Sequence, residues 1–309
     1  MAIHGTNDVV TVTGSADVLE PGIRRILAPN PSPMTQRGTN TYIVGERRVA
    51  VIDPGPALRS HHEAILGALD PGESISHIFV THSHLDHSSL AAALSETTGA
   101  AVHAFDDGLA GRSEIMQALA ATGSVGGGEG LDPGFEPHER LADGAAVDGD
   151  NWRLTAIWTP GHTGNHLCFA FGDAIFSGDH VMGWASTMIS PPDGDMAAYM
   201  ASVKRLSDRD DRVFHPGHGD PVTEPKARLR WLLDHRRSRE ASILGHLDRR
   251  GQSITELVED VYGDIPAALM PAAARNVLAH LIDLCERGLA VADPRPSLHA
   301  RYFRGHREP

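Results

Sequence analysis

A short segment that runs from His82 to His87 places three histidines and one aspartate within six positions, directly after the apolar run 78–80. Neutral imidazole and carboxylate groups are good ligands for zinc and similar divalent metals. The spacing of two between His82 and His84 suits an extended loop in which both side chains bind one ion. Asp86 and His87 are adjacent and can turn towards a second ion. The segment therefore predicts a metal site at the end of a strand.

The same design recurs three times downstream, where an apolar run ends in glycine and then in a residue that can bind a metal. The runs are 154–161 before His162, 174–178 before Asp179, and 212–217 before His218. Short apolar runs bounded by Gly and Pro are typical of buried strands. We expect these four strands to bring their ligands to one edge of a sheet. Seven candidates then fit two metal sites, with Asp179 as the bridge.

With these motifs in view, the chain closely resembles the metallo-beta-lactamase superfamily. The matching motifs are His82-Ser83-His84-Leu85-Asp86-His87, Thr159-Pro160-Gly161-His162-Thr163, Ser177-Gly178-Asp179 and Pro216-Gly217-His218-Gly219. A finer resemblance, in residues 30–34 and 38–45, is to the beta-lactamase-like protein 2 group, which has a winged-helix-like domain after the catalytic one. The resemblance implies an α/β fold, an αββα sandwich followed by a small winged-helix-like α domain.

The resemblance also implies which residues hold each ion. His82, His84 and His162 would hold the first ion, and Asp86, His87 and His218 the second, with Asp179 between them. We expect two divalent ions, zinc in the first place and iron or manganese as alternatives, because His/Asp sites accept all three.

The expected activity is hydrolysis by a metal-bridging hydroxide, since two dications lower the pKa of a shared water from about 15.7 towards 7. Asp86 would accept the proton of the attacking water, a role that the resemblance implies. The first substrate class is a small ester, thioester or lactone. The alternative is a single-stranded RNA endonuclease, which needs basic or aromatic contacts near the metals, such as Arg37, Trp184 or Arg301. A non-catalytic metal-stabilised binding protein ranks third, because all seven ligands are present.

Charge bears on the choice between these classes. The net charge of −13 is uneven, because residues 226–309 carry a net of +3 and the rest of the chain −16. Phosphate neutralisation dominates nucleic-acid affinity, so an acidic catalytic domain is poorly suited to binding polyanions. We therefore expect a small-molecule substrate and disfavour a nucleic-acid partner. A homodimer through the amphipathic C-terminal helices is compatible with the sequence.

Composition sets the remaining expectations. The 309 residues, 41% of them hydrophobic, can build a catalytic domain over 1–225 and a winged-helix-like domain over 226–309. In the second domain we expect helices at 226–247, 254–261 and 272–287 and a hairpin or wing at 289–303. No signal peptide or membrane-spanning run is evident. Cys168 and Cys285 are too few for a disulfide framework, so we expect reduced thiols and a cytoplasmic protein.

A few polar residues next to the ligand motifs have two readings each. Asp53 is either a carboxylate that orients the ligand loop or a turn residue before Pro-Gly. His166 and His180 could contact substrate or be partly exposed. His61 and His62 are expected on the surface. The segment 38–40 is expected to line the site through its backbone.

Overall fold

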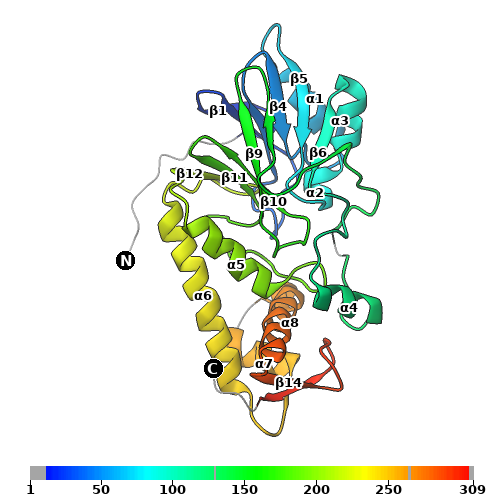
Figure 1. The fold of residues 1–309 in the computed structure, drawn as a ribbon, viewed down its shortest axis with the longest axis vertical. Coiled ribbons are helices and arrows are strands. Elements are labelled where there is room, and N and C mark those ends of the chain that lie inside the picture. The colour runs from blue at the N-terminus through cyan, green and yellow to red at the C-terminus, as the bar shows by residue number, and fades with distance from the viewer. Residues whose placement is uncertain (1–11, 129, 264–265, 306–309) are drawn as a thin grey trace.

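The catalytic part of the chain is built on two stacked β-sheets, seen in the computed structural model, which describes residues 12–128, 130–263 and 266–305 (Figure 1). The larger sheet has the order β1-β2-β3-β4-β5-β6-β7. Neighbours are antiparallel from β1 to β4 and parallel from β4 to β7. Its strands are β1 (Ala16–Glu20), β2 (Ile23–Leu27), β3 (Asn40–Val44), β4 (Arg48–Ile52), β5 (Ser74–Phe79), β6 (Ala101–Ala104) and β7 (Glu139–Arg140).

The second sheet has the order β12-β11-β10-β9-β8, with β11 and β12 parallel and the other neighbours antiparallel. Three of the four strands expected to carry ligands lie here, and the fourth is β5 of the larger sheet. The expectation of a single sheet edge is therefore wrong. The reason is that β5 pairs in parallel with β4 and β6 of the larger sheet. The strands are β8 (Ala146–Asp148), β9 (Arg153–Trp158), β10 (Leu167–Phe171), β11 (Ala174–Gly178) and β12 (Val213–Pro216).

Side-chain alternation along the strands creates four layers. In β4, Ala50 and Ile52 point between the two sheets, where they join Phe79 and Phe169 in one buried cluster. Their neighbours Val49 and Val51 point the other way, against helices. Successive side chains of a strand lie on opposite faces, so a strand apolar on both faces must be covered on both. The predicted αββα sandwich is confirmed.

Helices cover the outer faces of both sheets (Figure 1). α1 (Arg59–Gly67) and α3 (Ala91–Thr98) lie on the larger sheet, and α5 (Met196–Ser207) lies on the smaller one. Between β5 and β6 the helical stretch is broken, because the short α2 (Leu85–Ser88) carries the end of the ligand segment and α3 begins only at Ala91. The break lets α2 present Asp86 and His87 inward while α3 packs Leu94 against the sheet.

The C-terminal part has the outline of a winged helix. It contains α6 (Pro225–His246), β13 (Gln252–Ser253), α7 (Ile254–Tyr262), the 3-10 turn η1 (Ala267–Leu269), α8 (Met270–Glu286), β14 (Ala290–Asp293) and β15 (Arg301–Arg304). The expected hairpin is confirmed as β14 and β15, which pair antiparallel, with β13 added to β15. The boundary between residues 225 and 226 stays a prediction.

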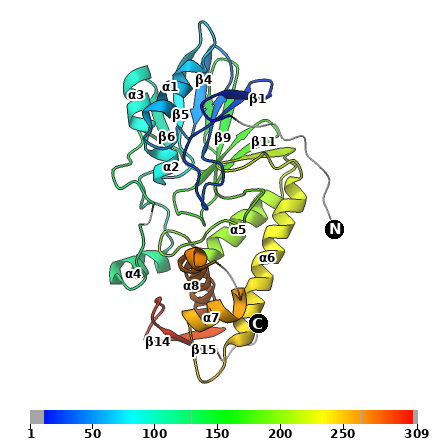
Figure 2. The ribbon, with the colours of Figure 1, turned by 180° about the vertical axis from the view of Figure 1, so that it is seen from behind.

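The catalytic and C-terminal parts pack against each other over several helices. α6 runs from the small sheet to α7, as both views show (Figures 1 and 2), and it contacts α5 as well as α7 and α8. α4 (Glu114–Thr122) belongs to the catalytic part in sequence, yet its Met116 and Leu119 are buried in the same cluster as Val277 and Leu281 of α8. None of the described helices is long and apolar enough to cross a lipid bilayer.

Gly178, the last residue of β11, leads to a prediction about stability. Its φ is +46°, and a Cβ there would lie 2.7 Å from both His166 Nε2 and Thr81 Oγ1. Gly172 is the matched control, because its φ is +60° and no atom lies within 4 Å of its added Cβ. We expect Gly172→Ala to lower the free energy of unfolding by about 1–2 kcal/mol, the cost of left-handed backbone. Gly178→Ala should cost more, from the added clash. Equal losses in urea unfolding would contradict this account.

Candidate metal centre

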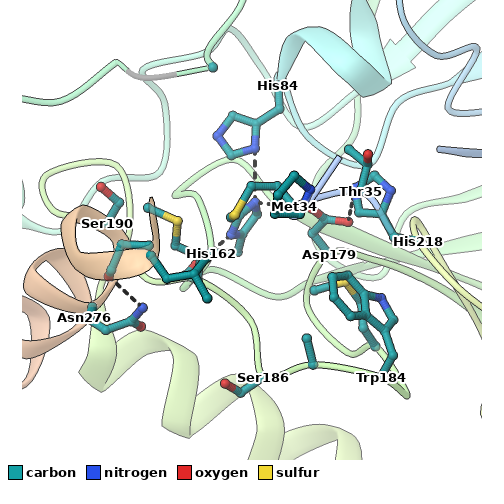
Figure 3. A pocket seen from close by; sticks show the side chains of 18 of the residues that line it. Met34, Thr35, His84, His162, Asp179, Trp184, Ser186, Ser190, His218 and Asn276 are labelled. Atoms are coloured by element: carbon teal, nitrogen blue, oxygen red, sulfur yellow. Dashed lines mark hydrogen bonds and ion pairs between the residues drawn. The ribbon is translucent and has the colours of Figure 1, made fainter. Parts of the chain in front are cut away.

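The ends of four strands from two sheets deliver all seven predicted ligands to one place. The segment after β5 supplies the first four side chains, and the turns after β9, β11 and β12 supply His162, Asp179 and His218. Figure 3 shows His84, His162, Asp179 and His218 pointing towards a common centre at the base of a pocket. The ligand atoms fall into three overlapping groups, each within 4.8 Å: His82, His84 and His162; His82, His87 and Asp179; and Asp86, His87 and His218.

The first group consists of three imidazole nitrogens. His84 Nδ1 lies 2.9 Å from His82 Nε2 and 3.0 Å from His162 Nε2. Donors around one tetrahedral zinc, each about 2.0–2.1 Å from the ion, lie roughly 3.3 Å apart, so this trio is close to the required geometry. Burial lowers the pKa of His82 well below its ordinary value and that of His84 to about 3. Neutral rings with converging lone pairs are suited to a cation.

The second group combines two imidazoles with a carboxylate. His218 Nε2 lies 3.3 Å from Asp86 Oδ2 and 3.4 Å from His87 Nε2. Burial lowers the pKa of these two rings, but the nearby carboxylates raise it by more. Asp86, Asp179 and Asp53 raise the pKa of His87 well above its ordinary value, and Asp179 and Asp86 raise that of His218 to about 9. Before a metal binds, protons on these two rings balance the acidic side chains.

Asp179 faces both groups at once. Its Oδ1 lies 3.4 Å from His218 Nε2 and 3.5 Å from His87 Nε2, and its Oδ2 lies 3.7 Å from His162 Nε2. Oδ1 is buried and has no hydrogen-bond partner among the described residues. Burial raises the pKa of Asp179, but His218 and His87 together hold it well below the ordinary value. A charged carboxylate with an oxygen towards each group is suited to bridging two cations.

The far nitrogens of these rings are held by the fold. Asp53 Oδ2 lies 2.9 Å from His87 Nδ1, while both Asp53 oxygens accept hydrogen bonds from Thr81, at 2.7 and 2.8 Å. Of its two readings, Asp53 therefore takes the orienting one. The carbonyl of Gly38 lies 3.2 Å from His218 Nδ1, and the carbonyl of Met188 lies 2.8 Å from His162 Nδ1. Such contacts fix the tautomer and leave Nε2 for a metal.

Other residues singled out in the sequence have mixed outcomes. The segment 38–40 meets the ligands through its backbone at Gly38, whose carbonyl faces His218 Nδ1, and through a side chain at Thr39, whose Oγ1 donates to Asp86 Oδ2 at 3.2 Å. His166 and His180 are fully buried rather than partly exposed, and they lie behind the ligands. His61 is also fully buried, so its expected surface position is wrong; its ring bonds Thr41 Oγ1 at 2.8 Å.

The residues proposed as contacts for RNA are dispersed. Trp184 lines the pocket, and it is labelled in Figure 3. Arg37 is paired with Asp220, and Arg301 lies on the wing strand β15, where it bonds the carbonyl of Gly251.

A pocket of about 470 Å³ opens above the ligand groups, a size suited to small-molecule ligands. Both parts of the chain form its wall. Sequence reasoning missed most of this wall, because it comes from a segment without regular structure and from one face of α8. Its apolar members are Pro33, Met34, Met182, Trp184, Ala185, Met188, Leu269, Ala272 and Ala273.

Two family models match the chain, one for each part. Residues 34–218 match the metallo-beta-lactamase superfamily, and residues 253–295 match the beta-lactamase associated winged helix domain. The chain therefore belongs to the metallo-beta-lactamase superfamily, whose members bind divalent metals, and it is a hydrolase of that superfamily. Within the superfamily it is similar to the beta-lactamase-like protein 2 homolog of Drosophila melanogaster, at 31% identity over 87% of this chain and 90% of that protein.

Two further similarities are informative. The atrochrysone carboxyl ACP thioesterase of Aspergillus fumigatus is 29% identical over 81% of this chain and 76% of its own length. A beta-lactamase domain protein from Burkholderia ambifaria superposes with a TM-score of 0.81 at 21% identity, covering 97% of this chain and 96% of that one. The second similarity supports the fold alone.

The opposite protonation of the two groups leads to a prediction about metal binding. At pH 7 the first group is neutral, so an ion can bind there without displacing protons. His87 and His218 are protonated, so an ion in the second group should release about two protons. Affinity for that ion should rise with pH through the range in which these protons are lost, which for His218 lies around pH 9. Calorimetric titration in buffers of different ionisation enthalpy measures this release. Equal proton release in both binding steps would contradict it.

Proposed function

We propose that the protein is a dinuclear metal-dependent hydrolase of small esters, thioesters or lactones with an apolar acyl group. The observation that carries the proposal is the position of Asp179, with one carboxylate oxygen towards each of two ligand groups at the base of an apolar pocket. We expect zinc, with iron or manganese able to occupy the same donors.

The ligands and their neighbours define the roles of the chain in catalysis. When bound, two dications would lower the pKa of a water molecule and polarise the substrate carbonyl. Asp86 lies at the pocket wall and is partly exposed, so its carboxylate can take the proton of the attacking water. Thr39 donates to Asp86 Oδ2, the same oxygen that lies 3.3 Å from His218 Nε2, and so helps to fix that carboxylate. Asp53 keeps the His87 ring in place through Nδ1.

The chemistry of the pocket supports a neutral, apolar acyl group. Methionine, alanine, leucine and tryptophan side chains dominate its wall, and no lysine or arginine belongs to the described lining residues. A polyanion would meet the carboxylates of Asp86 and Asp179 there, while Asp193 is already paired with Arg112. This disfavours the RNA endonuclease. The similarity to an ACP thioesterase supports a thioester as the first substrate to test.

Hydrolysis assays with a substrate panel test the proposal. The panel contains acyl thioesters, lactones, nitrocefin, a phosphodiester and single-stranded RNA, each with metal-loaded and chelator-treated protein. We expect hydrolysis of a thioester, ester or lactone that is lost with the metal and restored by zinc. RNA cleavage without acyl hydrolysis would overturn the substrate assignment. The cytoplasmic location and the homodimer remain predictions.

Replacing Asp179 by Asn tests the bridge. The amide keeps the size of the side chain but loses its charge, so we expect one bound ion instead of two and a fall in kcat of about 100-fold or more. Asp173→Asn, an exposed aspartate just before β11, is the matched control and should keep both ions. Mass spectrometry of bound metal and steady-state kinetics measure the two effects. Two ions with unchanged turnover in Asp179→Asn would refute the bridging role.

Replacing Ala272 by Phe tests the acyl-binding wall. Ala272 lines the pocket from α8, so a larger side chain should shorten the space for the acyl chain. One methylene in an apolar pocket is worth about 10-fold to 200-fold in kcat/KM. We therefore expect kcat/KM for octanoyl thioesters to fall at least about tenfold relative to acetyl thioesters. The acetyl substrate is the internal control. An unchanged ratio would place the acyl group elsewhere.

A further inference from the structure

The segment 182–191, which joins β11 to α5, forms a large part of the pocket wall but contains no helix or strand. Buried backbone groups outside regular structure need hydrogen-bond partners from elsewhere. Thr187 and Ile189 of this segment are almost fully buried. The partners of this segment therefore determine its position.

Most of these partners come from the C-terminal helices. Arg228 of α6 donates to the carbonyls of Met182 and Ala185, at 2.7 and 2.6 Å. Two turns further along α6, Arg236 donates to the carbonyl of Thr187 and, at 3.1 Å, to Asn276 Oδ1 of α8. The same Asn276 oxygen accepts the amide of Ile189 at 3.2 Å, and Arg275 donates to the carbonyl of Pro191. The segment is thus anchored to the C-terminal part by arginines and one asparagine; Asn276 is labelled in Figure 3.

The same residues of the segment hold the candidate ligands on their other side. The Thr187 hydroxyl is shared between two carbonyl acceptors, that of Asp179 at 2.8 Å and that of His180 at 2.9 Å. The carbonyl of Met188 lies 2.8 Å from His162 Nδ1. Thr187 therefore contacts both Asp179 and Arg236, while Met188 contacts His162 and Ile189 contacts Asn276. Two steps of hydrogen bonding connect α6 and α8 to two ligands.

Arg236 is the costly member of this connection. Its side chain is only 2% exposed, it lies 5.4 Å from the Tyr199 ring, and among the described residues it pairs with no carboxylate. Burial of an unpaired guanidinium is unfavourable, and an apolar side chain of similar volume would pack at lower cost. Packing alone therefore does not explain an arginine at this position. Its hydrogen bonds to Asn276 and to the 182–191 segment do.

We propose that Arg236 and Asn276 are positioning residues of the metal centre, acting on His162 and Asp179 through residues 187–189. The C-terminal part is then a component of the metal site and not only a wall of the pocket. The proposal rests on the proposed metal-binding role of those two ligands. Because coupling between two equilibria is reciprocal, metal binding also strengthens the contact between α6, α8 and the segment.

Arg236→Met tests the connection from the helix side. Loss of a neighbour that orients a ligand typically weakens metal binding about 10-fold to 100-fold. We expect a zinc dissociation constant raised by that factor, measured by competition with a chromophoric chelator. Arg236→Lys, which keeps the charge and one donor, should restore part of it. Arg239→Met is the matched control, because Arg239 lies on the same helix but donates to the carbonyl of Val261 in α7. Its zinc affinity should equal that of the wild type.

Thr187→Val tests the same connection from the ligand side and keeps the shape of the side chain, which protects the test if Arg236→Met does not fold. The variant loses the bonds to Asp179 and His180, so zinc affinity should fall. The double variant should fall by less than the product of the single effects, since both act on one path. Zinc should also slow amide exchange at residues 187–189 in the wild type and less so in Arg236→Met.

Three results would overturn the proposal. The first is wild-type zinc affinity in both Arg236→Met and Thr187→Val. The second is an equal loss in Arg239→Met, which would indicate general destabilisation. The third is a wild-type protein that binds no zinc, iron or manganese. That result would refute the metal centre itself, and the positioning role with it, so it is distinguishable from the first two.

Discussion

The convergence of five imidazoles and two carboxylates at the ends of strands from two sheets is the constraint on which the rest of the structure depends. Such groups are costly to bury together unless cations neutralise and bind them. The fold holds them in place all the same. Asp53 and Thr81 orient His87, Gly38 orients His218, and the buried Asp179 Oδ1 faces the second group without a hydrogen bond in the described part of the chain. The sandwich can be understood as the scaffold for this cluster, since strands from both of its sheets end at the ligands.

Much of this arrangement could be predicted from the sequence because the ligands follow strands at short range. An apolar run that ends in glycine and a histidine or aspartate indicates both the strand and the position of its ligand, and all seven predicted side chains lie together. The division of the strands between two sheets could not be read in the same way, since pairing depends on partners far apart in the chain. The burial of His61 could not be predicted either, because its ring forms a hydrogen bond with Thr41 on β3, twenty residues earlier in the chain.

The pocket wall was the least predictable part. Its apolar surface combines residue 34, the irregular segment 182–191 and one face of α8, and no periodic pattern connects these three. α6 and α8 contribute arginines and Asn276 whose bonds end on backbone carbonyls and amides, and sequence patterns do not report such contacts. The C-terminal part therefore has a role in shaping the site that its winged-helix outline does not suggest. Its modest positive charge fits a packing role better than nucleic-acid binding.

Crystals of the zinc-loaded protein, measured on both sides of the zinc absorption edge, test the central claim most directly. The account predicts two anomalous peaks per chain, about 3.5–4 Å apart, one among His82, His84 and His162 and the other among Asp86, His87 and His218. Asp179 should contact both. A single peak, or zinc bound away from these side chains, would contradict the dinuclear centre.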